Sequence, residues 1–469
     1  MRILPQVPPT PEQLTIMRYS GPGTSLIKGA AGSGKTTTAL LRLKMQCSQR
    51  LLRRDRLGSP EPVRVLVLTY NRTLSGYVRE LAAQQVADHD ELQLEVQTFG
   101  KWAKDLVGVD SDLIVDRFGM EAMLAPLVRT VPGENGFLID EVEYLLGRFP
   151  PDHLDVYVPT KREGRGLSPR MERTVRERLL AEVVEPYQLL KAQGGVMDWN
   201  DIAVAAGGRG GVVPWDVIVV DEAQDFAANQ VRAILQHAAP LASVTFVMDA
   251  AQRIYPRFFS WREVGETEFA GGRHVLRTNY RNTREIAAFA QPLVEGLQLD
   301  GDGQIPDFTS CVRSGPLPVI VAGRYSQQIN FILNRLIKTV DFEKESVAFL
   351  QPKGGGWFSD LRSRLQAAGL PYAELTRASV WPRGPEAVAL CTLHSAKGLE
   401  FDHVVLPGLN QQVTPHGQEE GDVHLDALRR LIAMGLGRAR TSVHIGFKPS
   451  DPSTILGMFK PDTYQLVTL

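Results

Sequence analysis

Apolar and polar positions form two alternating patterns along the chain, namely short uninterrupted apolar runs and longer segments of helical periodicity. Uninterrupted runs rich in β-branched residues are typical of strands that are buried on both faces of a parallel sheet. In the first half they predict strands at residues 24–29, 63–70, 216–223 and 243–249. In the second half they predict strands at residues 317–323, 346–351, 386–394, 403–408 and 441–447. The predicted fold class is therefore α/β, with two parallel-sheet domains.

A helical segment separates the second and third of these runs. Residues 110–205 have mostly helical periodicity, most clearly in the charged stretch at residues 168–193. The glycine-rich stretch at residues 205–214 is typical of a linker that returns the chain to the sheet. We therefore expect a helical insertion within the first sheet domain. The length of 469 residues, which favours about three domains of ordinary size, agrees with this organisation.

Residues 27–39, IKGAAGSGKTTTA, contain the pattern GxxxxGK[ST] between a predicted strand and a predicted helix. In such a loop the backbone N–H groups and the helix N-terminus face phosphate oxygens. Lys35 would reach the β- and γ-phosphates, and Thr36 would offer its hydroxyl to Mg²⁺. The predicted contacts to a nucleoside triphosphate are Gly29, Gly32, Ser33, Gly34, Lys35, Thr36 and Thr37.

The stretch VIVVDEAQDF at residues 217–226 supplies the carboxylates that hydrolysis requires. An apolar strand places Asp221 at its C-terminal end, where it would hold Mg²⁺ through water. Glu222 beside it would polarise the attacking water. Together with the phosphate loop, this pair predicts a site for ATP and Mg²⁺ that hydrolyses the nucleotide.

Composition and charge do not identify the binding partner of the protein. A content of 43% hydrophobic and 22% charged residues is that of a soluble globular protein. The net charge of −1 shows no global basic excess, although a large protein can hold a basic groove on one face. The three cysteines form no CxxC pair and so indicate neither a zinc ribbon nor a disulfide framework. The chain also has neither the apolar region of a signal peptide nor an apolar run of about 18 residues, so we expect a cytoplasmic protein.

Five motifs in this order resemble the UvrD/Rep/PcrA branch of superfamily 1 helicases. The most specific of them is the block at residues 392–402, which kinases and GTPases lack. The motifs are GAAGSGKT, VDEAQD, NYR (279–281), TLHSAKGLEFD (392–402) and GRAR (437–440). The resemblance extends from about residue 10 to about residue 447. It implies two RecA-like P-loop domains, with domain 1A formed by residues 1–109 and 206–275, insertion 1B by 110–205 and domain 2A by 276–469.

The resemblance also implies roles around the nucleotide. Gln13 stands where the family hydrogen-bonds adenine, Tyr280 where it stacks on adenine, and Glu400 where it contacts the sugar.

Three more positions resemble the residues that act on the γ-phosphate. Gln252 corresponds to the γ-phosphate sensor, and Arg281 and Arg438 correspond to the arginines that neutralise transition-state charge. An arginine that another domain supplies raises kcat by a factor of about 10³–10⁵. The predicted catalytic residues are thus Lys35, Glu222, Gln252, Arg281 and Arg438.

The resemblance implies a groove for single-stranded DNA. Hydroxyl and amide groups position phosphates there, and aromatic rings stack on bases. The family spacing is altered at residues 255–263, so Phe258 and Phe259 remain alternatives to Trp261 as the stacking residue. The predicted strand contacts are Thr69, Asn71, Thr98, Phe99, Trp261, Thr392 and His394.

The sequence departs from the family in two places. Only residues 282–391 lie between the NYR and TLHSAKG motifs, and the second sheet needs most of them, so we expect the helical domain 2B of full-length relatives to be absent or vestigial. The final motif, RRLIAMGLGRAR at residues 429–440, lacks the usual tyrosine and threonine but keeps Arg438. In contrast, VMDWNDIA at residues 196–203 resembles the family segment that closes insertion 1B.

Two functional hypotheses follow. The first is an ATP-driven translocase or helicase on single-stranded DNA that moves 3′ to 5′, a direction that only the resemblance implies. The second is a nucleotide-switched subunit that recognises DNA and signals to a partner nuclease, as in compact UvrD-like subunits of anti-phage systems. A small-molecule kinase is rejected because it does not account for the block at residues 392–402. The preference for DNA or RNA stays open.

Overall fold

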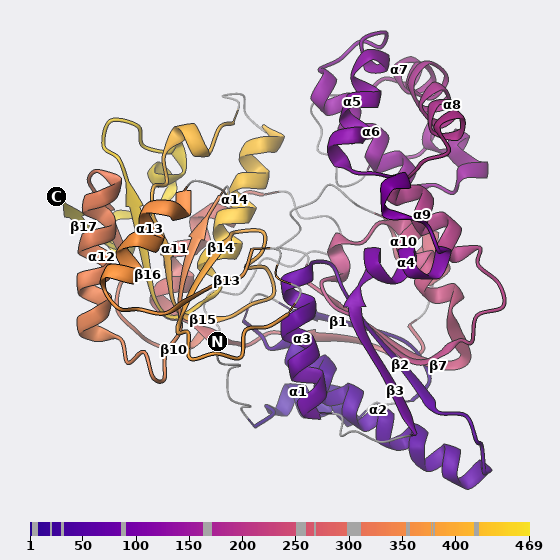
Figure 1. Cartoon of the computed structure of the whole chain (residues 1–469), viewed down its shortest axis with the longest axis horizontal. Coiled ribbons are helices and arrows are strands. Elements are labelled where there is room, and N and C mark those ends of the chain that lie inside the picture. Colours follow the sequence, from indigo (N-terminus) through magenta and orange to yellow (C-terminus); the bar gives the residue numbers. More distant parts are fainter. Residues whose placement is uncertain are drawn as a thin grey trace.

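The fold contains two parallel sheets and a helical lobe (Figure 1). The computed structural model describes residues 1, 8–18, 21–29, 32–85, 91–162, 171–249, 259–266, 269–297, 311–352, 357–376, 378, 380–416 and 422–469.

The first sheet has six strands in the order β3-β2-β6-β7-β1-β8, and every neighbouring pair is parallel. Its strands are β1 Gly23–Gly29, β2 Val63–Thr69, β3 Leu92–Thr98, β6 Trp215–Val220, β7 Ala238–Met248 and β8 Arg273–Leu276. Helices α1 Pro11–Arg18, α2 Lys35–Leu57 and α3 Arg72–Gln85 belong to one side, and α4 Phe99–Val107, α9 Trp199–Gly207 and α10 Ala228–Gln236 to the other.

The uninterrupted apolar runs follow from this two-sided cover. Successive side chains on a strand point to opposite faces. Val65 and Val67 of β2 pack in the core shared with α2 and α3, whereas Leu66 and Leu68 pack in the core shared with α4, α9 and α10. Both faces of the strand are therefore buried, and no polar alternation can appear in its sequence.

The helical lobe lies between β4 Ile114–Val115 and β5 Met197–Asp198, which pair in parallel at its base. It has a hydrophobic core of its own, separate from those of the sheets. A bidentate ion pair fastens it to the first sheet domain, because Arg148 donates to both carboxylate oxygens of Glu263 at 2.8 and 2.9 Å. Its helices are α5 Arg117–Val128, α6 Asn135–Arg148, the 3₁₀ helix Pro151–Tyr157, α7 Arg173–Arg178, the π-helical Leu179–Val184 and α8 Glu185–Gly194.

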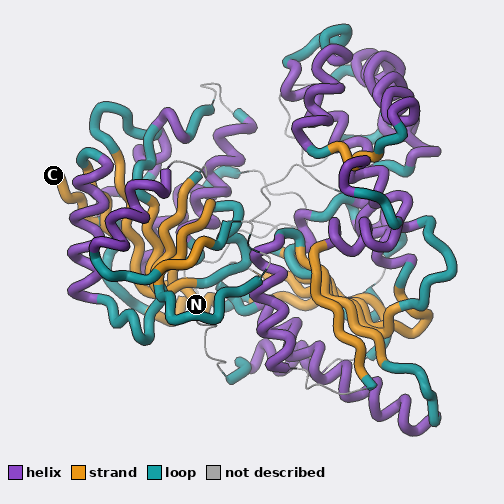
Figure 2. The backbone as a smooth tube through the Cα atoms, viewed as in Figure 1, coloured by secondary structure: helices purple, strands orange, loops and turns teal. Residues whose placement is uncertain are grey.

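The second sheet has seven parallel strands in the order β13-β14-β12-β15-β16-β11-β17. They are β11 Val319–Ala322, β12 Val347–Gln351, β13 Tyr372–Glu374, β14 Val388–Thr392, β15 Phe401–Leu406, β16 Ala439–Phe447 and β17 Gln465–Thr468. The accompanying helices are α11 Arg284–Val294, α12 Tyr325–Thr339, α13 Trp357–Ala367 and α14 Val423–Leu436, and a small pair of strands is β9 Asn279–Thr283 with β10 Cys311–Arg313. Figure 2 shows the two sheets as separate groups of strands surrounded by helices.

The predicted fold class, α/β with two parallel sheets and a helical insertion in the first, is confirmed. Each strand predicted from an apolar run is present. The strands that were not predicted include edge strands such as β3 and β17, because one side of an edge strand is exposed and its sequence is mixed. Within the described part of residues 284–387, the helices and strands are those of the second sheet and the small β9–β10 pair, with no separate helical domain. No helix in the described ranges is long and apolar enough to cross a membrane.

Candidate active site

The phosphate loop connects β1 to α2 and requires glycine at two described positions. Gly32 and Gly34 both have φ of 77°, in the left-handed region that favours glycine. A Cβ atom on Gly32 would come within 2.2 Å of Asn279 Oδ1. The backbone N–H of Tyr280 donates to Gly32 O at 3.0 Å, so the NYR segment packs directly against the loop.

The first two residues of α2 meet carboxylates that follow β6 and β7. Thr36 Oγ1 donates to Asp221 Oδ2 at 2.9 Å, and Lys35 Nζ donates to Asp249 Oδ2 at 3.0 Å. Burial and the neighbouring Glu222 raise the pKa of Asp221. A cation would relieve this buried negative charge, and hydroxyl and carboxylate oxygens are the ligands that Mg²⁺ takes. Thr36 and Asp221 therefore fit Mg²⁺.

Glu222 has an unusual backbone and an unusual set of neighbours. Its φ of 54° is the only positive value among the non-glycine residues in the described ranges. Burial acts to raise the pKa of its carboxyl, but Lys397, Arg438 and Lys35 together lower it. Gln224 also donates to this carboxylate. The carboxylate is thus held ionised, as a group that accepts a proton from water must be.

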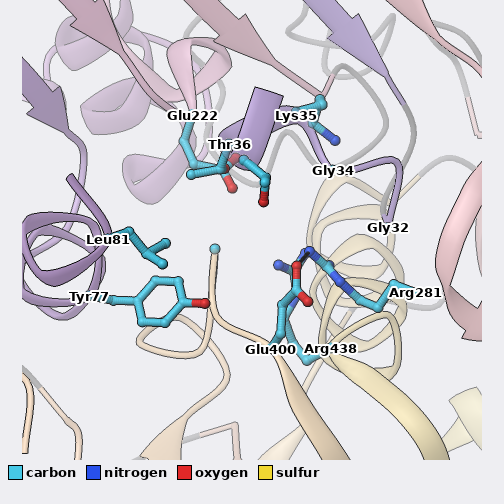
Figure 3. Close-up of a pocket in the computed structure, with 12 residues that line it drawn as sticks. Gly32, Gly34, Lys35, Thr36, Tyr77, Leu81, Glu222, Arg281, Glu400 and Arg438 are labelled. Atoms are coloured by element: carbon cyan, nitrogen blue, oxygen red, sulfur yellow. Dashed lines mark hydrogen bonds and ion pairs between the residues drawn. The ribbon is translucent and has the colours of Figure 1, made fainter. Parts of the chain in front are cut away.

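Residues from the second half of the chain complete the pocket (Figure 3). It is lined by Gly32, Gly34, Lys35, Thr36, Thr37, Tyr77, Leu81, Glu222, Arg281, Gly398, Glu400 and Arg438. The phosphate loop and Glu222 therefore face two arginines from elsewhere in the sequence.

The two arginines are positioned by backbone carbonyls and by Glu400. Arg281 on β9 forms an ion pair with Glu400 and donates to Gly437 O at 3.4 Å. Arg438 is 2% exposed and donates from Nε to Met434 O at 3.1 Å. Burial and the nearby Arg281 lower the pKa of Arg438 to about 10. Glu400 remains ionised, because Arg281 outweighs the effect of burial and lowers the pKa of its carboxyl.

Strand β9 is bonded to both halves of the pocket. At one end Tyr280 N–H donates to Gly32 O of the phosphate loop, as described above. At the other end Asn282 Nδ2 donates to Ala439 O at 2.6 Å and to Gly437 O at 3.3 Å. Residues 279–283 thus link the first sheet to the end of α14 and the start of β16.

The residues expected at adenine lie beside the loop. Gln13 is 6% exposed, and its Nε2 donates to Gly34 O at 3.5 Å. Tyr280 is half-buried. Gln252, the expected γ-phosphate sensor, and Phe258 lie outside the described residues.

A buried ion pair between the two sheet domains was not predicted from the sequence. Lys397 Nζ lies 2.5 Å from Asp225 Oδ2 and 3.8 Å from Glu222 Oε2. The Lys397 and Asp225 side chains are 2% and 0% exposed. Asp225 lies inside the motif VDEAQD, and Lys397 lies inside the motif TLHSAKGLEFD. Membership of these motifs was the signal in the sequence that could have pointed to the pair. The pair joins the segment after β6 to the segment after β14 and places a cation beside Glu222.

The polar residues expected to contact a strand cap turns and helices in this structure. Thr69 Oγ1 donates to Asn71 O at 3.1 Å, and Asn71 Oδ1 accepts from Leu74 N at 2.7 Å at the start of α3. Thr98 Oγ1 accepts from Lys101 N at 3.3 Å at the start of α4. Thr392 accepts in the same way from Ser395 N at 3.2 Å. His394, in the same turn as Thr392, is exposed.

The two aromatic residues expected at the groove are buried. Phe99 is 4% exposed and packs against Trp102 and Phe226. Trp261 is 8% exposed and packs against Phe246, Phe259 and Phe269. Neither ring offers an open face to a base in this structure, because both complete the core beside α4, α9 and α10.

Trp199, which was not singled out, is exposed instead. Among the tryptophans whose side chains are described it alone is exposed, at 41%. It starts α9, and its ring lies against Gly100, where an added Cβ would come within 3.3 Å of Trp199 Cζ3. Its position against Gly100, in the first turn of α4, could not be inferred from sequence spacing.

Comparisons with known proteins agree with this geometry. The model of an AAA domain family matches residues 13–257, more than half of the 469 residues. The model of the UvrD-like helicase C-terminal domain matches residues 358–448.

Individual relatives match over shorter stretches. The chain is 44% identical over 62 residues to a probable DNA helicase II homolog of Rickettsia conorii, which covers 13% of this chain and 10% of the relative. It is 40% identical over 63 residues to ATP-dependent DNA helicase PcrA of Bacillus subtilis, over 13% of this chain and 8% of the relative. The aligned stretch is thus a tenth or less of either relative's length. A solved C-terminal domain of a possible DNA helicase from Lactobacillus is 22% identical and covers 40% of this chain and 99% of that domain, with a TM-score of 0.31 that is too low to carry weight.

Replacing Lys397 by methionine is expected to lower the Tm, because Asp225 would stay buried without its cation. Removal of one partner from a buried ion pair costs about 3–5 kcal/mol. The measurement is differential scanning calorimetry on the whole chain. The double variant Lys397→Met with Asp225→Leu is expected to recover most of the loss, since it removes the unpaired charge.

Arg383→Met is the matched control, because Arg383 forms an ion pair with Glu80 of α3 across the same cleft but its side chain is 79% exposed. This variant is expected to leave the Tm unchanged. Equal Tm values for Lys397→Met and the unmodified protein would contradict a stabilising role of the buried pair.

Proposed function

Because the chain belongs to the UvrD-like family of superfamily 1 helicases, we propose that it hydrolyses ATP to move along single-stranded DNA. The observation that carries this proposal is the composition of the pocket. Lys35, Thr36 and Glu222 come from the first sheet domain, and Arg281 and Arg438 approach from segments joined to the second. Transition-state charge on the γ-phosphate is neutralised only when both parts are in place.

In this proposal each part of the pocket has a role. Lys35 and the loop amides hold the phosphates, Thr36 and Asp221 hold Mg²⁺, and Glu222 orients the attacking water. Arg281 and Arg438 stabilise the transferring phosphoryl group, and Gln252 senses it. When bound, Mg²⁺ would neutralise negative charge on the phosphates. Hydrolysis and release of the products then change how strongly the two sheet domains bind each other.

The strand would lie along the C-terminal edge of both sheets. The caps at Thr69, Thr98 and Thr392 lie where strands end, and such hydroxyl and amide groups can contact phosphates without reading sequence. His394 and Trp199 are exposed near them and fit a backbone contact and a base-stacking contact. We assign residues 1–109 and 206–275 to domain 1A, 110–205 to 1B and 276–469 to 2A, without a 2B domain. We carry over the 3′ to 5′ direction from the family.

A second candidate is a nucleotide-switched subunit that recognises DNA for a partner nuclease or repair protein. The observation that favours it is the absence, within the described part of residues 284–387, of a separate helical domain. The two candidate functions share the ATP site. They differ in whether closure of the two sheet domains on ATP moves the DNA strand or signals to a partner. The compartment is proposed to be the cytoplasm in either case.

Single-stranded DNA is expected to stimulate ATP hydrolysis by the isolated chain. Glu222→Gln is expected to lower kcat by about 10²–10⁴, the contribution of a general base, with a smaller effect on KM. The measurement is steady-state phosphate release with and without an oligonucleotide. Glu61→Gln, at an exposed loop position, serves as the control and is expected to behave as the unmodified protein.

An assay on a 3′-tailed duplex separates the two candidates. Processive unwinding supports the translocase, whereas stimulated hydrolysis without unwinding supports the switch. No stimulation by any nucleic acid would refute both.

Arg438→Lys is expected to lower kcat by about 10³ or more, because a lysine cannot reproduce the planar guanidinium at the transferring phosphoryl group. Arg440→Lys is the matched control, two residues further on the same segment, where Arg440 pairs with Asp402 at 3.2 Å. Arg440→Lys is expected to retain activity. Similar losses in the two variants would contradict the assignment of Arg438 as the second arginine finger.

Trp199→Ala is expected to weaken binding of a poly-dT oligonucleotide, since stacking of one base on an aromatic ring contributes about 1–3 kcal/mol. Fluorescence anisotropy of the labelled oligonucleotide measures the change, and Trp199→Phe should recover part of it. Phe118→Ala, which removes a ring that is 76% exposed on α5, is the control. Unchanged affinity in Trp199→Ala would place the strand elsewhere.

A further inference from the structure

One polar group in the pocket wall has no protein partner among the described residues. Tyr77 on α3 is 8% exposed, and its hydroxyl points into the pocket (Figure 3). No described group forms a hydrogen bond with it, and its oxygen is not among the fully buried atoms, so it faces the open pocket. No function was expected for this residue from the sequence. Its hydroxyl is therefore available to a ligand in the pocket.

The ring of Tyr77 is held in place across the cleft. It packs against Trp381, with the ring centroids 4.9 Å apart, and the indole N–H of Trp381 donates to Met1 O at 3.0 Å. One turn earlier on α3, Thr73 Oγ1 donates to Leu375 O at 2.7 Å. This face of α3 thus docks on Leu375 and Trp381 of the second half. The hydroxyl is directed into the pocket by packing and needs little reorganisation to meet a ligand.

The charges around the hydroxyl indicate the kind of ligand. Burial and then the nearby carboxylate of Glu400 raise the pKa of Tyr77, so the phenol stays protonated and can donate. Glu400 is ionised and can only accept. The carboxylate beside the phenol favours a ligand that can both accept and donate, and an alcohol can accept from the phenol and donate to the carboxylate. The apolar Leu81, on the same helix, suits the carbon face of a sugar ring.

We propose that Tyr77 is a nucleotide-contacting residue that donates a hydrogen bond to a hydroxyl of the nucleotide sugar, with Glu400 as the neighbouring acceptor. This rests on the proposed function in one respect, that the pocket holds ATP with its phosphates on Lys35 and Thr36. The sugar contact of Glu400 was expected from its motif, whereas Tyr77 lies outside the five motifs and adds a second contact. Helix α3, from outside the phosphate loop, distinguishes a ribonucleotide from a deoxynucleotide.

The test is calorimetric titration of ATP, 2′-deoxy-ATP and 3′-deoxy-ATP with Mg²⁺ into the Glu222→Gln protein, which suppresses turnover. We expect at least one deoxy form to bind more weakly than ATP. Adding Tyr77→Phe keeps the ring on Trp381 and removes only the hydroxyl. It should weaken ATP binding about 2- to 13-fold, the range of one net hydrogen bond, and lower the ratio between ATP and the discriminated deoxy form. Tyr464→Phe, whose ring packs on Phe289 in the second half, is the control and should change neither value.

Three results would overturn this inference. They are equal binding of all three nucleotides by the unmodified pocket, an unchanged ATP affinity in Tyr77→Phe, and a loss that is the same for ATP and both deoxy forms. Each of them leaves the proposed ATPase intact, since ATP still binds. Absence of binding for every nucleotide would instead refute the proposed ATPase together with this contact.

Discussion

The pocket depends on keeping the buried carboxylate of Glu222 charged. Asp221 and Glu222 follow each other at the end of a buried strand, where burial disfavours the ionised form of each and their charges repel. The pKa of Asp221 is raised, whereas three cations lower the pKa of Glu222. Lys35 comes from the phosphate loop, whereas Lys397 and Arg438 come from the second half. The ionised form of Glu222 is therefore stabilised from both halves of the chain.

The same electrostatic requirement explains the buried pair of Lys397 and Asp225. A lysine that is 2% exposed needs a carboxylate close by, and Asp225 supplies it at 2.5 Å. Lys397 lies five residues beyond Thr392, in the turn that carries His394. This turn therefore carries both the exposed His394 and a cation that lowers the pKa of Glu222.

Much of the fold and of the phosphate site could be predicted from the sequence, and the reason is physical. Strands covered on both faces have uninterrupted apolar runs, and a glycine with φ of 77° at Gly34 cannot be replaced without strain, so both leave a clear pattern. Burial of a single aromatic residue leaves no such pattern in the sequence. Phe99 and Trp261 are aromatic residues of the kind that stack on bases but complete a core, whereas Trp199 is exposed with its ring against Gly100. Tyr77 and the Lys397–Asp225 pair depend on contacts between distant segments, which spacing along the chain does not report.

Strand β9 is the short segment at which the two walls of the pocket meet. It is bonded to Gly32 on one side and to Gly437 and Ala439 on the other. Arg281 lies within this strand, so its guanidinium is carried by the same residues that join the phosphate loop to the end of α14. A substitution that disturbs residues 279–283 would therefore affect the phosphate loop and the position of both arginines at once.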